Sequence, residues 1–401
     1  MISVDEARGR ILAALRPTPA ELVPLAEGWG RVTAAPVLSR LTQPPHDVSA
    51  MDGYAVRAGD AVLGADLRVV GSAPAGHPWA GTLRAGEALR LFTGSLLPDG
   101  ADAIVIQEDT RRDGDIIAVT EAAAAGRHIR RAGQDFACGD VLLPAGKRLN
   151  ARDIGLAAAG NHPWLTVHRR PRIAILATGD EIAMPGEPIP PGGIVSSNSH
   201  ALAALVRAAG GDPVVLPVVA DDRAALMAVA DAVAGMDMLV TTGGASVGEH
   251  DLVQEALGAR GLKVDFWQIA MRPGKPLMFG RMGTVAMLGL PGNPVSSLVC
   301  AILFLLPAIQ VFCGMPAAPP PTVQARLGAD VPANDKRADH LRATLSVGAD
   351  GGLVATPFPR QDSAMLRLMV QADGLVLRAP FAPRAAVGDV VEVVRLDALG
   401  V

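Results

Sequence analysis

Two glycine-rich turns carry the residue types best suited to chemistry in this chain. They are Thr241-Thr242-Gly243-Gly244-Ala245-Ser246 and Leu290-Pro291-Gly292-Asn293-Pro294. Each follows a short apolar run and precedes a segment that can be helical, an arrangement in which backbone N–H groups and a helix N-terminus hold an anion. Either turn alone could use glycine only to reach positive φ. The pair predicts a pocket for a phosphate-rich or oxyanionic ligand.

Acidic side chains stand where strands of the same region are expected to end. Glu181 closes the turn Thr178-Gly179-Asp180-Glu181, Asp251 opens a helix after the first glycine turn, and Asp221 and Asp222 open another helix. Carboxylates at such positions can hold Mg²⁺ through one or two oxygens while phosphates supply the remaining ligands. The alternative for the three aspartates is helix N-capping, which can coexist with a metal role.

Two cations flank a rigid turn nearby. Arg272 and Lys275 enclose Pro273-Gly274. The arginine offers a planar fork and the lysine a point charge, and both suit a phosphate or another oxyanion. An ordinary surface turn is the alternative.

An α/β unit must position these residues. Apolar runs and turn residues predict strands near 172–177, 213–219, 237–241, 263–269 and 284–288, and helices near 198–209, 222–234, 251–258 and 294–312. This alternation is typical of a mostly parallel sheet between helices. Ligands of such sheets bind at the carboxyl ends of the strands, where all these motifs fall. We expect this unit to span residues 171–314.

The rest of the chain is predicted to have different secondary structure. A helix is expected over residues 4–15 and a second one near Thr18. Short alternating runs between glycine and proline turns predict an inserted β-rich domain over 45–142. Residues 1–44 and 143–170 then form an elongated helical and linker part, and a proline-rich linker precedes a C-terminal β domain over 320–401.

Composition excludes several classes of protein. The net charge of −4, the pI near 6.1 and 3% aromatic residues argue against a nucleic-acid surface. The three cysteines form no C-x-x-C pair, so a structural zinc site or disulfide framework is not expected. The N-terminus shows no signal-peptide pattern, which predicts a cytoplasmic enzyme. The apolar run 295–313 fits a buried crossover helix better than a membrane span.

An upstream segment, Ser49-Ala50-Met51-Asp52-Gly53-Tyr54-Ala55, completes the set of motifs. As a set and in this order, the motifs resemble those of the molybdopterin molybdenumtransferases, which share their architecture with the E domain of gephyrin. The resemblance covers roughly the whole chain. It implies the multidomain organisation given above, with a β-barrel-like C-terminal domain, and a homodimer whose pocket lies near the dimer interface.

The resemblance also implies an activity: insertion of molybdate into adenylylated molybdopterin with Mg²⁺-dependent release of AMP. It gives catalytic roles to Asp52, Thr93, Glu181 and Asp251, and metal binding to Glu181, Asp251 and one of Asp221 and Asp222. The residues implied in substrate binding are Gly243, Gly244, Ser246, Arg272, Lys275, Pro291, Asn293 and Pro294, with Arg342 and Ser363 as contributors from a partner subunit. Glu108, Asp135 and Asp140 match further family positions, with turn roles as the alternative for the two aspartates.

Some positions depart from the family pattern. Gln268 stands where many relatives carry lysine, which removes one oxyanion contact, and His46 and Val48 replace a common phenylalanine and asparagine. Two other functions stay open: a molybdopterin adenylyltransferase, and a non-catalytic pterin-binding scaffold. The resemblance further implies contact with molybdopterin-adenylating and molybdoenzyme maturation proteins, with no nucleic-acid or membrane partner.

Overall fold

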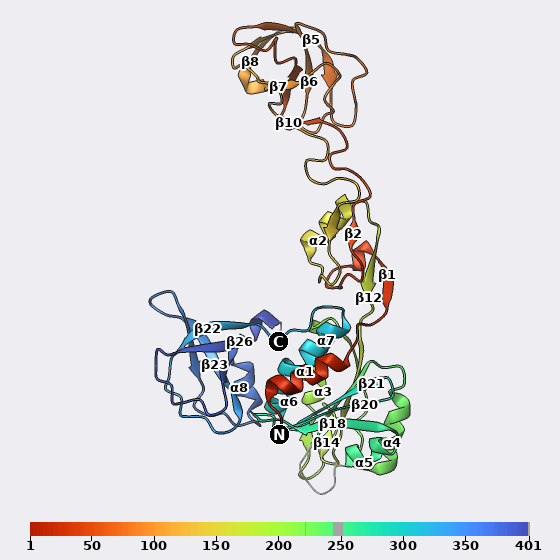
Figure 1. Ribbon diagram of the computed structural model, residues 1–401, viewed down its shortest axis with the longest axis vertical. Coiled ribbons are helices and arrows are strands. Elements are labelled where there is room, and N and C mark those ends of the chain that lie inside the picture. The colour runs from red at the N-terminus through yellow and green to blue at the C-terminus, as the bar shows by residue number, and fades with distance from the viewer. Residues whose placement is uncertain (221, 244–251, 400–401) are drawn as a thin grey trace.

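The computed structural model of the protein describes residues 1–220, 222–243 and 252–399. Figure 1 shows an elongated molecule with three parts. We call them the β-rich lobe (residues 48–130), the stalk (residues 16–47 and 131–170) and the base, in which an α/β unit lies beside a C-terminal β unit.

The α/β unit is built on a six-stranded sheet with the strand order β16-β13-β17-β21-β20-β18. Its strands are β13 (Arg172–Ala177), β16 (Asp212–Val215), β17 (Met238–Thr242), β18 (Leu262–Gln268), β20 (Pro276–Met282) and β21 (Val285–Leu290). The first four strands in this order pair in parallel, whereas β20 runs antiparallel to both its neighbours. Since β17 and β21 are buried along their whole length, they read as continuous apolar runs. The predicted, mostly parallel sheet is confirmed, and β20 is an additional strand.

Helices cover both faces of this sheet. One face carries α1 (Val4–Ala14), α3 (Asn198–Ala208) and a continuous helix made of α6 (Pro294–Cys300), a π-helical turn (Ala301–Leu305) and α7 (Leu306–Phe312). The other face carries α4 (Arg223–Ala232) and α5 (Leu252–Gly258). Side chains of β13 alternate between the two cores, as the two-residue period of a strand requires.

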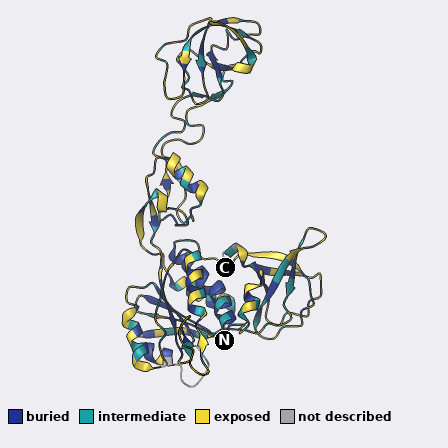
Figure 2. Cartoon of the chain, turned by 180° about the vertical axis from the view of Figure 1, so that it is seen from behind, coloured by how far each residue is buried: buried dark blue, intermediate teal, exposed yellow. Residues whose placement is uncertain are grey.

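The helix over Pro294–Phe312 is long and apolar enough to cross a membrane, but 89% of its most apolar window is buried inside the protein. It contacts α3 and β21. Figure 2 shows dark blue, the colour of buried residues, on the helices at the centre of the base beside exposed stretches in yellow. The prediction of a buried core helix is therefore confirmed.

The lobe holds a second six-stranded sheet, with the order β7-β4-β6-β5-β9-β8. Its strands are β4 (Gly53–Val56), β5 (Asp66–Ala73), β6 (Glu87–Leu91), β7 (Ala103–Ile106), β8 (Thr110–Asp113) and β9 (Ile116–Val119). The β-rich texture expected for this part of the chain comes from these strands, which enclose two small apolar cores.

The chain runs through the stalk twice, to the lobe and back. Two antiparallel ribbons line this path: β1 (Ala20–Pro24) with β12 (Trp164–His168), and β2 (Val37–Leu38) with β11 (Val141–Leu143). A third, β3 (Val48–Ser49) with β10 (Ile129–Arg130), lies where the lobe begins. Helix α2 (Ala151–Ala159) packs beside them. The helix predicted near Thr18 is wrong, because this segment pairs with β12 and becomes strand β1.

In the C-terminal unit, strands β23, β24, β22, β26 and β25 close into a ring through the pairing of β23 with β25. Their bounds are β22 (Thr322–Leu327), β23 (Ala338–Val347), β24 (Leu353–Pro357), β25 (Gly374–Arg378) and β26 (Val390–Arg395). The predicted barrel-like domain is confirmed. The short strand β19 (Met271–Arg272) of the α/β unit pairs with β23, so the two units share a sheet edge.

Candidate active site

A cavity of about 740 Å³ lies at the carboxyl ends of β13 and β17, and we call it the cleft. Its walls come from six places: the ends of these strands, the short pair β14 (Ile182–Ala183) and β15 (Ile194–Val195), the start of α3, the start of β20, the second glycine turn, and the start of α8 (Leu366–Val370) in the C-terminal unit. The cleft therefore lies where open α/β sheets bind their ligands.

The two glycine turns predicted from the sequence meet at the cleft. Gly243 follows β17 with φ of 90°, and a Cβ added there would lie 2.6 Å from the carbonyl oxygen of Thr178, so only glycine fits. A Cβ added to Gly292 would lie 3.6 Å from Cα of Gly243. Of the other predicted residues of the first turn and of the metal set, Gly244, Ser246, Asp221 and Asp251 lie outside the described residues.

Thr178 adds a polar group to this wall. Its side chain is 3% exposed, and its hydroxyl has no hydrogen-bond partner among the described residues. Thr178 lines the cleft, and its Oγ1 would lie 3.4 Å from a Cβ added to Gly243. Because a buried hydroxyl normally has a partner, the arrangement fits an oxyanion bound beside the first turn.

The second turn leads into α6. Pro294 occupies the first turn of that helix, where its missing N–H costs nothing. Asn293 stands at the N-cap position but makes no capping bond with its side chain. Instead, its Nδ2 donates to Oγ of Ser363 at 3.0 Å, and the N–H of Val295 donates to the carbonyl oxygen of Ser363 at 3.0 Å. Pro291, Gly292, Asn293 and Pro294 all line the cleft.

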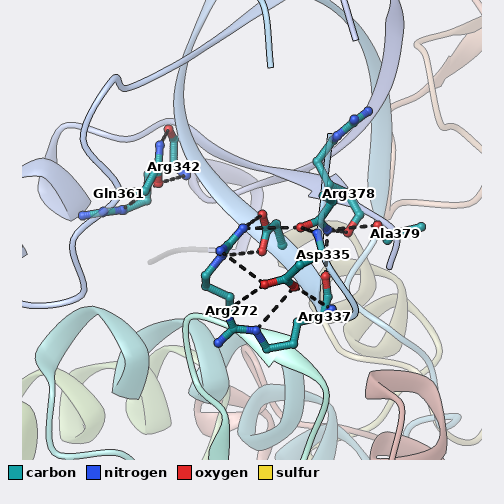
Figure 3. Close-up of polar contacts among 9 residues, drawn as sticks. Arg272, Asp335, Arg337, Arg342, Gln361, Arg378 and Ala379 are labelled. Atoms are coloured by element: carbon teal, nitrogen blue, oxygen red, sulfur yellow. Dashed lines mark hydrogen bonds and ion pairs between the residues drawn. The ribbon is translucent and has the colours of Figure 1, made fainter. Parts of the chain in front are cut away.

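Ser363 thus reaches the turn from its own chain, and Arg342 holds the loop that carries it. Arg342 is 1% exposed and donates to Oε1 of Gln361 at 3.3 Å, to the carbonyl oxygen of Met365 at 3.2 Å and to that of Asp362 at 2.9 Å. Figure 3 shows Arg342 directed at Gln361. Both residues were predicted to contribute to the site of a partner subunit. In the structure Ser363 contacts the second glycine turn of its own chain, and Arg342 is buried beneath the loop.

Arg272 also has a different surrounding from the one expected. Its Nε and Nη2 donate to the two oxygens of Asp339 at 2.8 and 2.5 Å, its Nη2 donates to Asn334 at 3.3 Å, and Asp335 lies 3.7 Å from Nη1 (Figure 3). The hydrogen bond to Asp339 raises the pKa of the guanidinium. Arg272 therefore joins the α/β unit to the C-terminal unit. Within the described ranges Lys275, which precedes the cleft residue Pro276, has no ion pair.

The carboxylates divide between the cleft and helix capping. Glu181 lines the cleft and folds over Gly179, where an added Cβ would lie 2.6 Å from its Oε2. Asp222 accepts a hydrogen bond from the N–H of Ala225 at 2.8 Å and caps α4, the alternative role considered for it. Within residues 1–220, 222–243 and 252–399, no three His, Cys, Asp or Glu side chains gather as a metal site.

Asp52 and Thr93 lie together on the lobe. The backbone N–H and the hydroxyl of Thr93 donate to Oδ1 of Asp52 at 2.7 and 2.9 Å. These two bonds, the backbone one first, lower the pKa of the half-buried Asp52 carboxyl. Figure 1 shows the lobe at the opposite end of the molecule from the cleft, so a single chain does not unite Asp52 with Glu181.

Sequence reasoning missed two polar residues at these sites. Arg90 stacks on the rings of Tyr54 and Phe92, with Cζ 5.1 and 5.0 Å from the ring centroids, and its charge acts on Asp52. Asn198 begins α3 in the cleft wall. The signal for Asn198 was the polar run Ser196-Ser197-Asn198-Ser199 at a helix start, whereas nothing local distinguishes Arg90 from the other arginines.

The remaining family positions lie on the lobe and stalk. Asp135 lines a second cavity of about 750 Å³ where lobe and stalk meet, together with His46 and Val48. Asp140 accepts from the N–H of Ala137 at 2.8 Å, which is a turn role, and Glu108 accepts from Gln107 at 3.3 Å.

A cleft of glycine turns at the strand ends of an α/β unit, carried on a long multidomain chain, defines a class of proteins that bind phosphate-bearing ligands. Family models match three consecutive parts of the chain: the "MoeA N-terminal region (domain I and II)" over residues 2–160, the "probable molybdopterin binding domain" over 174–311, and the "MoeA C-terminal region (domain IV)" over 324–396.

Individual relatives agree with these matches. The chain is 38% identical to the molybdopterin molybdenumtransferase of Nostoc sp. over 81% of this chain and 77% of that protein. It is 37% identical to molybdopterin molybdenumtransferase 2 of Mycobacterium tuberculosis over 94% and 95%. A crystal structure of the molybdopterin biosynthesis MoeA protein from Pyrococcus horikoshii superposes with a TM-score of 0.86 at 30% identity, over 98% of this chain and 99% of that one.

The chain belongs to the molybdopterin molybdenumtransferase (MoeA) family of enzymes. The family predicted from the sequence motifs is confirmed, and with it a role in molybdenum cofactor biosynthesis.

Proposed function

We propose that the protein inserts molybdate into adenylylated molybdopterin and releases AMP in a Mg²⁺-dependent reaction. One observation carries the proposal: two glycine turns meet at the cleft beside the carboxylate of Glu181 and the buried hydroxyl of Thr178, which has no partner among the residues that the structure describes. Such a site offers donors to a diphosphate and a carboxylate to a cation that accompanies it.

The reaction breaks a P–O bond of the diphosphate that links the pterin to AMP. An oxygen of molybdate or water forms the new bond to the phosphorus on the pterin side of the diphosphate. AMP leaves with the bridging oxygen. The amides of Gly243 and Gly292, and Lys275, which has no ion pair among the described residues, would hold the phosphate oxygens and stabilise the charge that grows on the leaving group. Molybdate, a tetrahedral oxyanion, would use donors of the same kind.

The donor set of the cleft fits Mg²⁺, which is bound in proteins through one or two carboxylates while phosphates complete its shell. Glu181 would hold it, with Asp251 and one of Asp221 and Asp222 as the further ligands predicted from the sequence. When bound, the ion would neutralise diphosphate charge.

We propose that two copies of the chain form the complete site. Asp52 and Thr93 lie on the lobe, far from the cleft of their own chain, so a homodimer would place the lobe of one copy at the cleft of the other. The lowered pKa keeps Asp52 ionised, which suits it to coordinate a cation. We also propose a cytoplasmic location and contacts with molybdopterin-adenylating and molybdoenzyme maturation proteins.

The direct test is AMP release from adenylylated molybdopterin with Mg²⁺, in the presence and absence of molybdate. We expect molybdate-dependent release that disappears in Asp52→Asn. The control Asp113→Asn changes an exposed carboxylate on β8 of the same lobe and should leave release intact. Tight ligand binding without release would instead indicate a pterin-binding scaffold, and formation of adenylylated pterin from ATP would indicate an adenylyltransferase.

A further inference from the structure

One amide side chain joins the two glycine turns of the cleft. Asn198 is the first residue of α3, and its Nδ2 lies 2.7 Å from Oγ1 of Thr242 and 2.7 Å from the carbonyl oxygen of Gly292. Thr242 directly precedes Gly243 in the first turn, and Gly292 is the centre of the second. A single side chain therefore ties together two turns that lie far apart in the sequence.

Chemistry fixes the orientation of this amide. The carbonyl oxygen of Gly292 can only accept a hydrogen bond, so the atom facing it must be the NH₂ group of Asn198. Both of its protons are used, one on each turn. The hydroxyl of Thr242 then donates to the carbonyl oxygen of Pro291 at 3.4 Å, which adds a second link between the turns. The other polar atom of the Asn198 side chain, Oδ1, has no hydrogen-bond partner within the part of the chain that the structure describes.

We propose that Asn198 is a positioning residue, which holds Gly243 and Gly292 of the two turns at a fixed spacing for the reacting diphosphate. This role rests on the proposed function. Donors aimed at developing charge are effective only when they are held in place beforehand, and a shift of about 1 Å can cost on the order of 100-fold in rate. Asn198 is only half-buried, and the N-cap residue of α3 is Ser197, so the network does not belong to the apolar core or to helix capping.

The test compares Asn198→Asp, Asn198→Ala and a control in steady-state AMP release with adenylylated molybdopterin and molybdate. Aspartate has the size of asparagine and is favourable in the first turn of a helix, so the variant should fold, yet it lacks the two protons. We expect kcat to fall by about 10- to 100-fold in both variants, with KM for adenylylated molybdopterin changed by less than about threefold.

The control is Asn150→Ala. Asn150 caps α2 in the stalk through two backbone N–H groups and does not line the cleft. It reports what the loss of two asparagine hydrogen bonds does through stability alone, and we expect kcat to change by less than about twofold. Thr242→Val should lower kcat in the same direction, and adding it to Asn198→Ala should cost less than the product of the two single effects, because both act on one network.

Two results would overturn the inference. One is an active wild-type protein whose kcat is unaltered by Asn198→Asp; the other is a loss in Asn198→Asp that Asn150→Ala reproduces. Absence of molybdate-dependent AMP release in the wild-type protein is a different failure, since it overturns the proposed function and this role with it.

Discussion

Two inactive variants, Asp52→Ala and Glu181→Gln, should restore activity when they share a dimer. Asp52 lies on the lobe and Glu181 in the cleft, at opposite ends of the molecule (Figure 1). In a twofold dimer, each site would take Asp52 from one copy and Glu181 from the other. A heterodimer of the two variants then has one site with both changes and one site with neither.

The expected size of the effect follows from counting sites. Equal amounts of the two chains pair at random, so about half of the dimers are heterodimers, and each carries one intact site of two. AMP release by the mixture should be about one quarter of the wild-type rate, and release by a heterodimer purified through two different tags about one half. A site made within one chain would give no restoration at all.

The assay is AMP release after co-expression, with each variant alone as the blank. A matched control pairs Asp52→Ala with Thr93→Ala. Both residues lie on the lobe, so every site keeps one defect and activity should stay at the level of the single variants. The reasoning is refuted if the purified heterodimer of Asp52→Ala and Glu181→Gln is folded and dimeric yet inactive.

Three further predictions concern single residues. Thr93→Val removes the hydroxyl bond but keeps the backbone bond that lowers the pKa of Asp52, so the acidic limb of the pH–rate profile should move part of the way to higher pH; an unmoved limb contradicts this. Burial lowers the pKa of His340 to about 4. Its ordinary value is about 6.5, so the unfolded chain binds more protons between these values, and the free energy of unfolding should fall by up to about 3 kcal/mol as pH drops from 6.5 to 4. His340→Gln should flatten that part of a urea-unfolding pH series, and an equal slope in both proteins would argue against it. Arg342→Met removes three charge-assisted hydrogen bonds to the loop of Ser363 and should destabilise the C-terminal unit by about 3–5 kcal/mol, against less than about 1.5 kcal/mol for Ser363→Ala, as measured by denaturant unfolding.

Local patterns in the sequence were enough to predict the α/β unit and its two glycine turns. Strands such as β17 and β21 are short apolar runs that end in turn residues, and a parallel sheet brings their carboxyl ends to one edge. The meeting of Gly243 with Gly292 follows from that topology, because β17 and β21 are neighbours. The core helix was also predictable, since it is apolar on all sides.

Contacts between distant segments decided what the sequence could not predict. Strand β1 reads as a helix start near Thr18, but its pairing with β12 overrides the local preference. Asp339, distant in the chain, takes two of the donors of Arg272, and no local pattern indicates this ion pair. Burial of Arg342 depends on a loop of the same C-terminal unit about 20 residues further along the chain, which no spacing reveals.

Because the chain passes through the stalk twice, two paired segments set the distance between the lobe and the base. The outgoing and returning segments pair at β1 with β12, at β2 with β11 and, where the lobe begins, at β3 with β10, so two paired segments carry the lobe. Shortening one of the two stalk segments alone would break the pairing. The distance between lobe and base can therefore change only when both segments change by the same length. If the lobe completes the cleft of a second copy, the length of the stalk sets where the lobe lies relative to that cleft. Residues of the stalk that touch no substrate would then determine the geometry of the shared site.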